Sequence, residues 1–204
     1  MSLGRWRALV DSNVLYSRTL RDWIALMYLA KANTCFDILW TEDIMAEVIY
    51  HLRKNHPHLA DEQVGGVRRR LAATFAAGAV TGYAIDPSAH YPDIYDAHVH
   101  CAAVHARADY IITLNASDFE GIDDQPYEVY SPDDFLVLID DSAPEIAHEA
   151  LHKQMRYHLG KGSPFSLPRS LVAAGAPVFA DRIRQHAQHL DIAALERATT
   201  LRAR

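Results

Sequence analysis

Four acidic residues, although far apart in the sequence, stand where a folded chain could bring them together. They are Asp11, Glu47, Asp96 and Asp118. Carboxylates gathered at one point repel one another and raise one another's pKa unless a cation lies between them. Mg²⁺ and Mn²⁺ are hard cations that prefer oxygen ligands, so we expect one of these ions at such a cluster. A metal ion there would lower the pKa of a bound water and activate that water for hydrolysis.

Two of these acids follow predicted strands. A short apolar strand over residues 7–10 ends directly before Asp11, and a buried strand over residues 110–113 precedes Asp118. Ligands gather at the carboxyl ends of the strands in an open parallel sheet. We therefore expect Asp11 and Asp118 at the same edge of the sheet.

The other two acids lie in predicted helices. Glu47 falls within a helix over about residues 42–55, near the edge of its apolar side, where a solvated glutamate would be unusual. This apolar side consists of Ile44, Val48, Tyr50 and Leu52. Asp96 lies near the start of a helix over residues 93–106, where it is either a helix cap or a metal ligand.

The arrangement of strands and helices predicts an α/β fold with helices on both faces of a central parallel sheet. Strands are expected over residues 7–10, 37–40, 79–85, 110–113 and 128–130, and helices over about 20–32, 42–55, 60–77, 93–106 and from 131. A linker over residues 140–144 is followed only by helical segments, at about 144–159, 170–174 and 178–203. We place one domain at residues 7–141 and a helical C-terminal extension at residues 142–204.

Charge is distributed unevenly along the chain. The net charge is −6, yet residues 76–150 alone contain 15 acidic and one basic side chain. Such a segment is either a solvated acidic face or a cation site. The two cysteines, Cys35 and Cys101, fit buried thiols better than a disulfide framework. No run of about 18 apolar residues and no secretion signal appears, so we expect a cytoplasmic protein without a membrane span.

Four stretches, in this order, resemble the signatures of PIN-domain proteins and look most like VapC-type bacterial toxins. They are residues 9–15 (LVDSNVL), the helix containing Glu47, Asp96 with its alanine-rich continuation, and residues 110–119 (YIITLNASDF). The resemblance covers about residues 7–140. It implies a PIN-like three-layer α/β/α fold and a metal-dependent endoribonuclease that hydrolyses RNA phosphodiesters with a metal-activated water. It also implies a cognate antitoxin partner and the possibility of a homodimer.

The resemblance also assigns site residues. Asp11, Glu47, Asp96 and Asp118 would be the catalytic, metal-binding acids, supported by Asn13, Thr113 and Asn115. Many family members have a further aspartate where this chain has Asn115, which leaves open whether one or two metals bind. Asp93, one helical turn before Asp96, is either a spare ligand or an N-terminal cap.

An all-acid site cannot attract RNA by itself, so cationic side chains must do so. The candidates in the first domain are Arg18, Arg21, Arg53, Lys54, Arg68, Arg69 and Arg70, and those in the extension are Lys153, Arg156 and Lys161. Alternatively, residues 68–70 are a solvated helix face or an antitoxin-binding surface.

Two other functions compete with a ribonuclease. His148-Glu149-x-x-His152 fits the H-E-x-x-H pattern of zinc peptidases, in which both histidines share a helix face. However, Met155 stands where the longer version of this motif has a glycine, and few residues follow. The other alternative is a catalytically silent PIN scaffold that binds RNA or protein.

Overall fold

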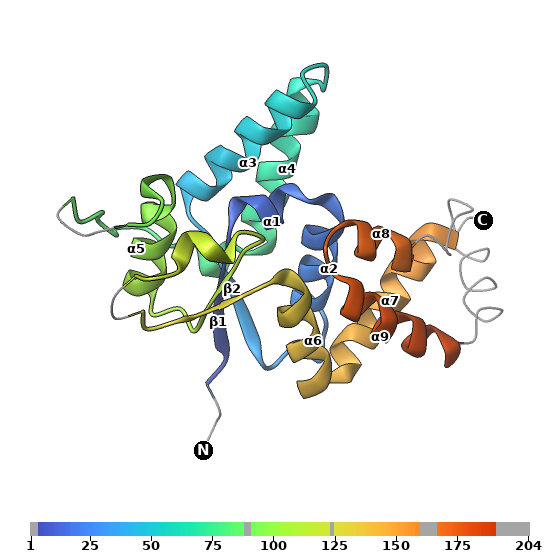
Figure 1. The fold of residues 1–204 in the computed structure, drawn as a ribbon. Coiled ribbons are helices and arrows are strands. Elements are labelled where there is room, and N and C mark those ends of the chain that lie inside the picture. Colours follow the sequence, from blue (N-terminus) through green and yellow to red (C-terminus); the bar gives the residue numbers. More distant parts are fainter. Residues whose placement is uncertain (1–3, 88–90, 123–124, 160–166, 191–204) are drawn as a thin grey trace. The chain divides into compact units, whose positions relative to one another are not determined.

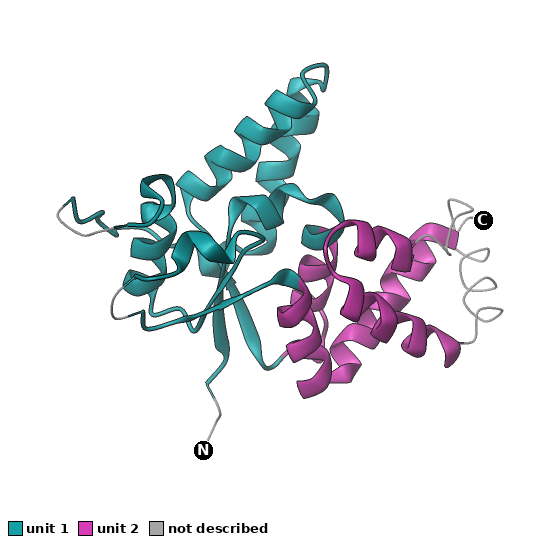
Figure 2. Ribbon diagram, viewed as in Figure 1, with its two compact units in different colours: residues 1–21, 34–132 teal, residues 22–33, 133–204 magenta. Residues whose placement is uncertain are grey.

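A computed structural model describes residues 4–87, 91–122, 125–159 and 167–190 of the chain. The chain divides into two compact units (Figure 2). The first contains residues 1–21 and 34–132, and the second contains residues 22–33 and 133–204. A segment near the N-terminus thus belongs to the same unit as the C-terminal helices. None of the described helices has the length and apolar character that a membrane span requires.

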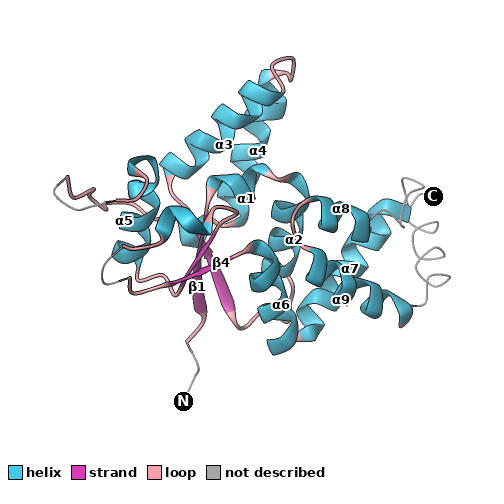
Figure 3. Ribbon diagram, in the orientation of Figure 1, coloured by secondary structure: helices cyan, strands magenta, loops and turns pink. Residues whose placement is uncertain are grey.

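A four-stranded parallel sheet lies at the centre of the first unit (Figure 3). Its strands are β1 (Trp6–Val10), β2 (Phe36–Leu39), β3 (Tyr110–Ile112) and β4 (Glu128–Tyr130), in the order β2-β1-β3-β4. Ala8, Leu9 and Val10 are all fully buried, as expected for a central strand covered on both faces. The predicted α/β fold with a central parallel sheet is confirmed.

Helices flank this sheet (Figure 1). They are α1 (Ser12–Tyr16), the first turn of α2 (Arg18–Tyr28), α3 (Glu42–Asn55), α4 (Asp61–Thr74) and α5 (Ala97–Ala106), with short 3₁₀ turns η1 (Ala76–Gly78), η2 (Ile94–Asp96) and η3 (Ala116–Phe119). Thr41 caps α3, because its hydroxyl accepts the Ile44 N–H at 3.0 Å. α3 and α4 run side by side as a hairpin of helices.

The prediction of a strand over residues 79–85 is wrong. Ala79 forms only an isolated parallel bridge with Trp40, and the chain then leaves the sheet. Gly82 has a positive φ of 79°, which no regular strand contains. Immediately before the bridge, Gly78 passes so close to β2 that an added Cβ would lie 1.8 Å from the Ile38 carbonyl oxygen. Residues 110–112 therefore form the third strand of the sheet, not the fourth.

Two helical predictions also need correction. The helix predicted over residues 20–32 is α2, which begins at Arg18 and already ends at Tyr28, and the short helix α1 before it was not predicted. Tyr50, assigned to the apolar side of α3, has 59% of its surface exposed, whereas Ile44 and Val48 are fully buried. Tyr50 lies outside the i, i+4 row that these two residues define, so it faces solvent.

The described residues of the second unit form helices joined by turns and contain no strand. It contains residues 22–28 of α2 with α6 (Pro132–Ser142, from Asp133 on), α7 (Pro144–Leu159), α8 (Leu167–Ala173) and α9 (Pro177–Gln188). Trp23 and Phe179 meet edge to face in its core, with ring centroids 5.3 Å apart. The domain boundary after residue 141 stays a prediction. The predicted helical residues beyond 190, and Lys161, lie outside the described residues.

Candidate functional site

The carboxyl ends of β1 and β3 place Asp11 beside Thr113. Val10 pairs with Ile112 across the two strands, and the Asp11 N–H donates to the Ile112 carbonyl at 3.0 Å. The next residue on each strand is therefore held at the same edge. The Thr113 hydroxyl donates to Asp11 Oδ2 at 2.7 Å.

Asp11 is almost fully buried, with 3% of its surface exposed. Its Oδ1 accepts the Ser12 N–H at 2.5 Å, and its Oδ2 accepts the Asn13 side-chain amide at 2.8 Å. The same amide reaches Thr113 Oγ1 at 3.0 Å, while Asn13 Oδ1 accepts the Leu114 N–H. Burial raises the pKa of Asp11, and hydrogen bonds from Thr113 and Ser12 oppose that shift. The carboxylate is thus held in one orientation.

A group of three acids forms from two short 3₁₀ turns. Asp93, Asp96 and Asp118 each offer a carboxylate oxygen, and these oxygens all lie within 4.8 Å of one another. The Asp93 side chain accepts the Tyr95 N–H at 2.8 Å, so its predicted capping role is confirmed. Asp96 stands at the N-cap position of α5 but makes no capping hydrogen bond. Capping therefore does not explain Asp96.

Electrostatics connect this group to the other predicted acids. The pKa of Asp96 is raised to about 7, first by burial and then by the charges of Asp11, Asp118, Asp93 and Glu47. The other three acids predicted from the sequence therefore all act on Asp96. Within the described part of the chain, no lysine or arginine forms an ion pair with any of these five acids. Such a set of carboxylate oxygens fits a hard divalent cation.

His98 belongs to the same site, although the sequence did not assign it there. Its Nε2 lies 3.6 Å from Glu47 Oε1, and 9% of its side chain is exposed. Its Nδ1 lies 2.8 Å from the Tyr95 carbonyl oxygen. The sequence signal for a buried His98 is its spacing of four residues from Ala102, because residues i and i+4 share a helix face. Both residues are buried on α5.

Asn115 differs from the other predicted supporting residues in how it contacts the site. Its side chain is exposed, and only its backbone N–H contacts the site, donating to Thr113 Oγ1 at 3.0 Å. This donation helps to fix the hydroxyl that holds Asp11.

The predicted cationic side chains differ in their contacts. Arg21 donates to the carbonyls of Leu15 and Tyr16, and so caps the end of α1. Arg53 pairs with Asp61 at 3.1 Å, and Arg68 with Glu42 at 2.5 Å. Lys54 lies over the Tyr50 ring, 5.6 Å from its centroid. Arg18, Arg69 and Arg70 are exposed.

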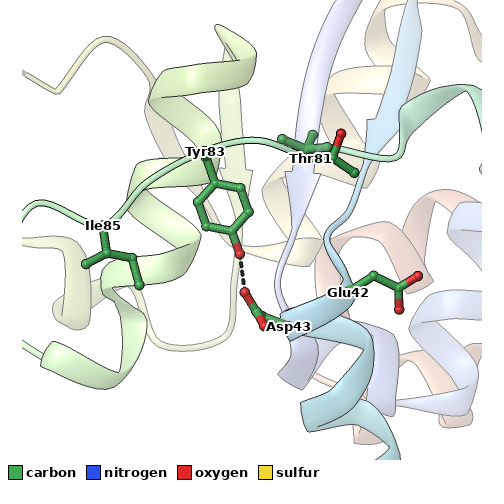
Figure 4. Close-up of a pocket in the computed structure, with 6 residues that line it drawn as sticks. Glu42, Asp43, Thr81, Tyr83 and Ile85 are labelled. Atoms are coloured by element: carbon green, nitrogen blue, oxygen red, sulfur yellow. Dashed lines mark hydrogen bonds between the residues drawn. The ribbon is translucent and has the colours of Figure 1, made fainter.

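An open pocket of about 400 Å³ lies at the start of α3 (Figure 4). Its lining is Glu42, Asp43, Val80, Thr81, Tyr83 and Ile85. The Tyr83 hydroxyl donates to Asp43, and burial together with this contact raises the pKa of Tyr83 to about 12. None of the predicted metal-binding acids lines this pocket.

The H-E-x-x-H motif lies on α7 in the second unit. His148 and His152 share a face, with ring centroids 4.7 Å apart. Glu149, however, accepts the Lys31 N–H at 2.8 Å and pairs with Lys153 at 2.7 Å, which lowers its pKa. Among the described residues, no third ligand completes a metal site with the two histidines. These contacts give Glu149 a structural role instead of that of a general base.

Comparison with known proteins gives one match. A search of curated proteins and of solved structures finds no protein similar to this chain. The sequence profile of the PIN domain, in contrast, matches residues 7–117. This range covers β1 to η3 and contains Asp11, Glu47, Asp93 and Asp96, while Asp118 follows directly. Because the match spans more than half of the chain, the protein belongs to the PIN-domain family, whose members are generally nucleases.

Proposed function

We propose that this protein is a divalent-metal-dependent endoribonuclease that acts as the toxin of a toxin–antitoxin pair. The observation that supports the proposal is the group of Asp93, Asp96 and Asp118, on which the charges of Asp11 and Glu47 also act through Asp96. Among the described residues, no lysine or arginine forms an ion pair with any of these five acids. Structural acids normally acquire partners, because an uncompensated buried charge is costly. A site that leaves its acids uncompensated is suited to a cation.

Asp93, Asp96 and Asp118 are the residues that would hold the ion, with Asp11 and Glu47 adding negative charge around them. When bound, Mg²⁺ or Mn²⁺ supplies a hydroxide nucleophile and offsets charge on the scissile phosphate. Asn13, Thr113 and the Ser12 N–H hold the Asp11 carboxylate in a fixed orientation before substrate arrives. Such preorganisation is how a nuclease without a side-chain nucleophile accelerates hydrolysis.

RNA would be held by the cationic residues around this unit. Arg18, Lys54, Arg69 and Arg70 are exposed and present positive charge on α2, α3 and α4. They would offset the repulsion between the acidic site and the phosphate backbone. The cognate antitoxin and a homodimer are further parts of the proposal, and they rest on the likeness to VapC-type toxins. A cytoplasmic location is also proposed, because the two cysteines fit a reducing compartment.

The test is cleavage of single-stranded RNA by the purified protein with Mg²⁺ or Mn²⁺, compared with the same reaction in a chelator. We expect cleavage only with metal, and we expect Asp11→Asn to abolish it while the melting temperature of the variant still shows a folded protein. Cleavage that persists in the chelator would contradict metal dependence. Ion binding without any RNA cleavage would identify a catalytically silent scaffold instead.

A further inference from the structure

We infer that His98 Nε2 and the Glu47 carboxylate form a nitrogen–oxygen ligand pair for a divalent transition-metal ion, in addition to the all-oxygen group of Asp93, Asp96 and Asp118. The inference deepens the proposed function and rests on it, because it concerns the ions of the same site. It gives the site a preference for Mn²⁺ over Mg²⁺.

The hydrogen bond at Nδ1 decides which nitrogen of His98 is available. Nδ1 lies 2.8 Å from the carbonyl oxygen of Tyr95, and a carbonyl only accepts, so Nδ1 carries a hydrogen. In the neutral ring, Nε2 then keeps its lone pair. Histidines that bind metals nearly always donate their other ring N–H to a carbonyl or a carboxylate, which fixes the ring. His98 already has this arrangement.

Nε2 has no hydrogen-bond partner among the described residues, although it is buried. A buried polar atom without a partner is unfavourable, because it has lost its hydrogen bonds to water. The atom facing it is Glu47 Oε1, at 3.6 Å, which is also an acceptor. Metal–nitrogen and metal–oxygen bonds of about 2.0–2.2 Å would let one ion contact both atoms across that gap. A cation between the two atoms satisfies both of them.

The two side chains come from helices that are fixed independently. Glu47 lies on α3 between Ile44 and Val48, which are fully buried. His98 lies on the buried face of α5 with Ala102. The charge of Glu47 also acts on Asp96, so this pair lies within the field of the acidic site. Two protein ligands suffice when waters and substrate phosphate oxygens complete the coordination, as is common for ions at phosphate-processing sites.

The nitrogen ligand has a consequence for ion choice. Mg²⁺ and Mn²⁺ both bind carboxylate oxygens, but Mn²⁺, as a first-row transition ion, accepts an imidazole nitrogen more readily than Mg²⁺ does. We therefore expect wild-type protein to bind Mn²⁺ about tenfold or more tightly than Mg²⁺, and His98→Gln to lose that preference.

The direct test is pulsed electron paramagnetic resonance of the full chain loaded with Mn²⁺. A coupling between Mn²⁺ and ¹⁴N is expected in the wild type and in the control His100→Gln, but not in His98→Gln. His100 lies on the same helix as His98, but its ring contacts Tyr127 and not Glu47. Bound Mn²⁺ without a nitrogen coupling would overturn the inference and leave the proposed metal site standing. Absence of Mn²⁺ binding would overturn both.

Calorimetric titration of the same variants with Mn²⁺ and with Mg²⁺ distinguishes two roles of His98, binding the ion and only supporting Glu47. Loss of affinity for Mn²⁺ alone in His98→Gln supports the inference. Equal losses for both ions would indicate that His98 only supports Glu47, which overturns it. If His98→Gln fails to fold, the spectrum of the wild type still decides.

Discussion

Two sets of carboxylates, one in each unit, meet opposite kinds of partner. In the second unit, each of three acids has a partner. Asp133 accepts the Val178 and Phe179 N–H groups at 2.9 and 2.8 Å, Asp140 contacts His186 Nε2 at 2.7 Å, and Glu149 pairs with Lys153. In the first unit, Asp96 and Asp118 face other acids. The pKa shifts follow this contrast, because that of Glu149 is lowered and that of Asp96 is raised.

Burial does not separate the two kinds of acid. Asp133 and Asp140 in the second unit have 8% and 4% of their surface exposed, close to the 3% of Asp11 in the first. Asp11 also accepts hydrogen bonds, so the acid that differs is Asp96. Asp133 accepts two N–H groups at the start of α9, where an acid stabilises the helix, whereas Asp96 meets further negative charge. The comparison therefore identifies a functional acid by its partners.

The largest effect should come from exchanging one carboxylate for an amide in each unit. Asp118→Asn removes a proposed metal ligand, so we expect RNA cleavage to fall at least about 100-fold. Glu149→Gln removes a carboxylate that is only structural, so cleavage should stay within about twofold of wild type. Both rates are measured under the same metal concentration. Similar losses in both variants would break the comparison.

A stability measurement tests the same comparison through a carboxylate of the second unit. Asp133→Ala leaves the Val178 and Phe179 N–H groups without their acceptor, and unpaired buried donors cost about 1–3 kcal/mol each. We expect the free energy of unfolding to fall by about 2 kcal/mol in a urea titration. Cleavage by the folded variant should be unchanged. A loss of stability below about 0.5 kcal/mol would show that these contacts are not structural.

The pH dependence of the metal-free protein tests the crowded acids. Asp96 binds its proton more tightly in the folded chain, with a pKa of about 7, than at its ordinary value of 3.8. Its contribution to the free energy of unfolding is therefore fully present below about pH 4 and is lost as the pH rises through about 7. Because Asp96 is half-buried, solvent screening limits this loss to about 1–2 kcal/mol.

The matched variant is Asp96→Asn, which cannot ionise. Without metal at pH 8 it should be more stable than wild type, and the difference should disappear near pH 4. Adding Mn²⁺ should stabilise wild type more than the variant. A difference that does not vary with pH would mean that the acids do not crowd one another.

Local pattern was enough to predict part of this site. Asp11 and Thr113 end buried apolar runs, and parallel strands bring such ends together, so their neighbourhood followed from residue order. Glu47 was identified because a glutamate between Ile44 and Val48 is unusual. These inferences needed only the period of a helix and the direction of a strand.

The remaining features depend on contacts between distant segments. His98 is near Glu47, which lies on another helix, and no local pattern of the sequence links these two residues. The apolar residues at 79–85 have strand propensity, but Gly78 pressed against Ile38 and the positive φ of Gly82 turn the chain away. Similarly, the sequence does not show that Lys31 and Lys153 hold Glu149.

The smallest expected effect extends the comparison from acids to cations. Arg68 on α4 is already paired with Glu42, whereas no described residue forms an ion pair with the exposed Arg70 on the same helix. A free guanidinium can neutralise a phosphate, and a paired one must first give up its partner. Arg70→Ala should therefore raise the KM for RNA about two- to fivefold. It should also reduce the salt dependence of binding by about one phosphate contact. Both effects should be smaller in Arg68→Ala. The measurement is a KM series over salt concentration for both variants. A larger effect of Arg68→Ala would show that the Glu42 pair opens when RNA binds.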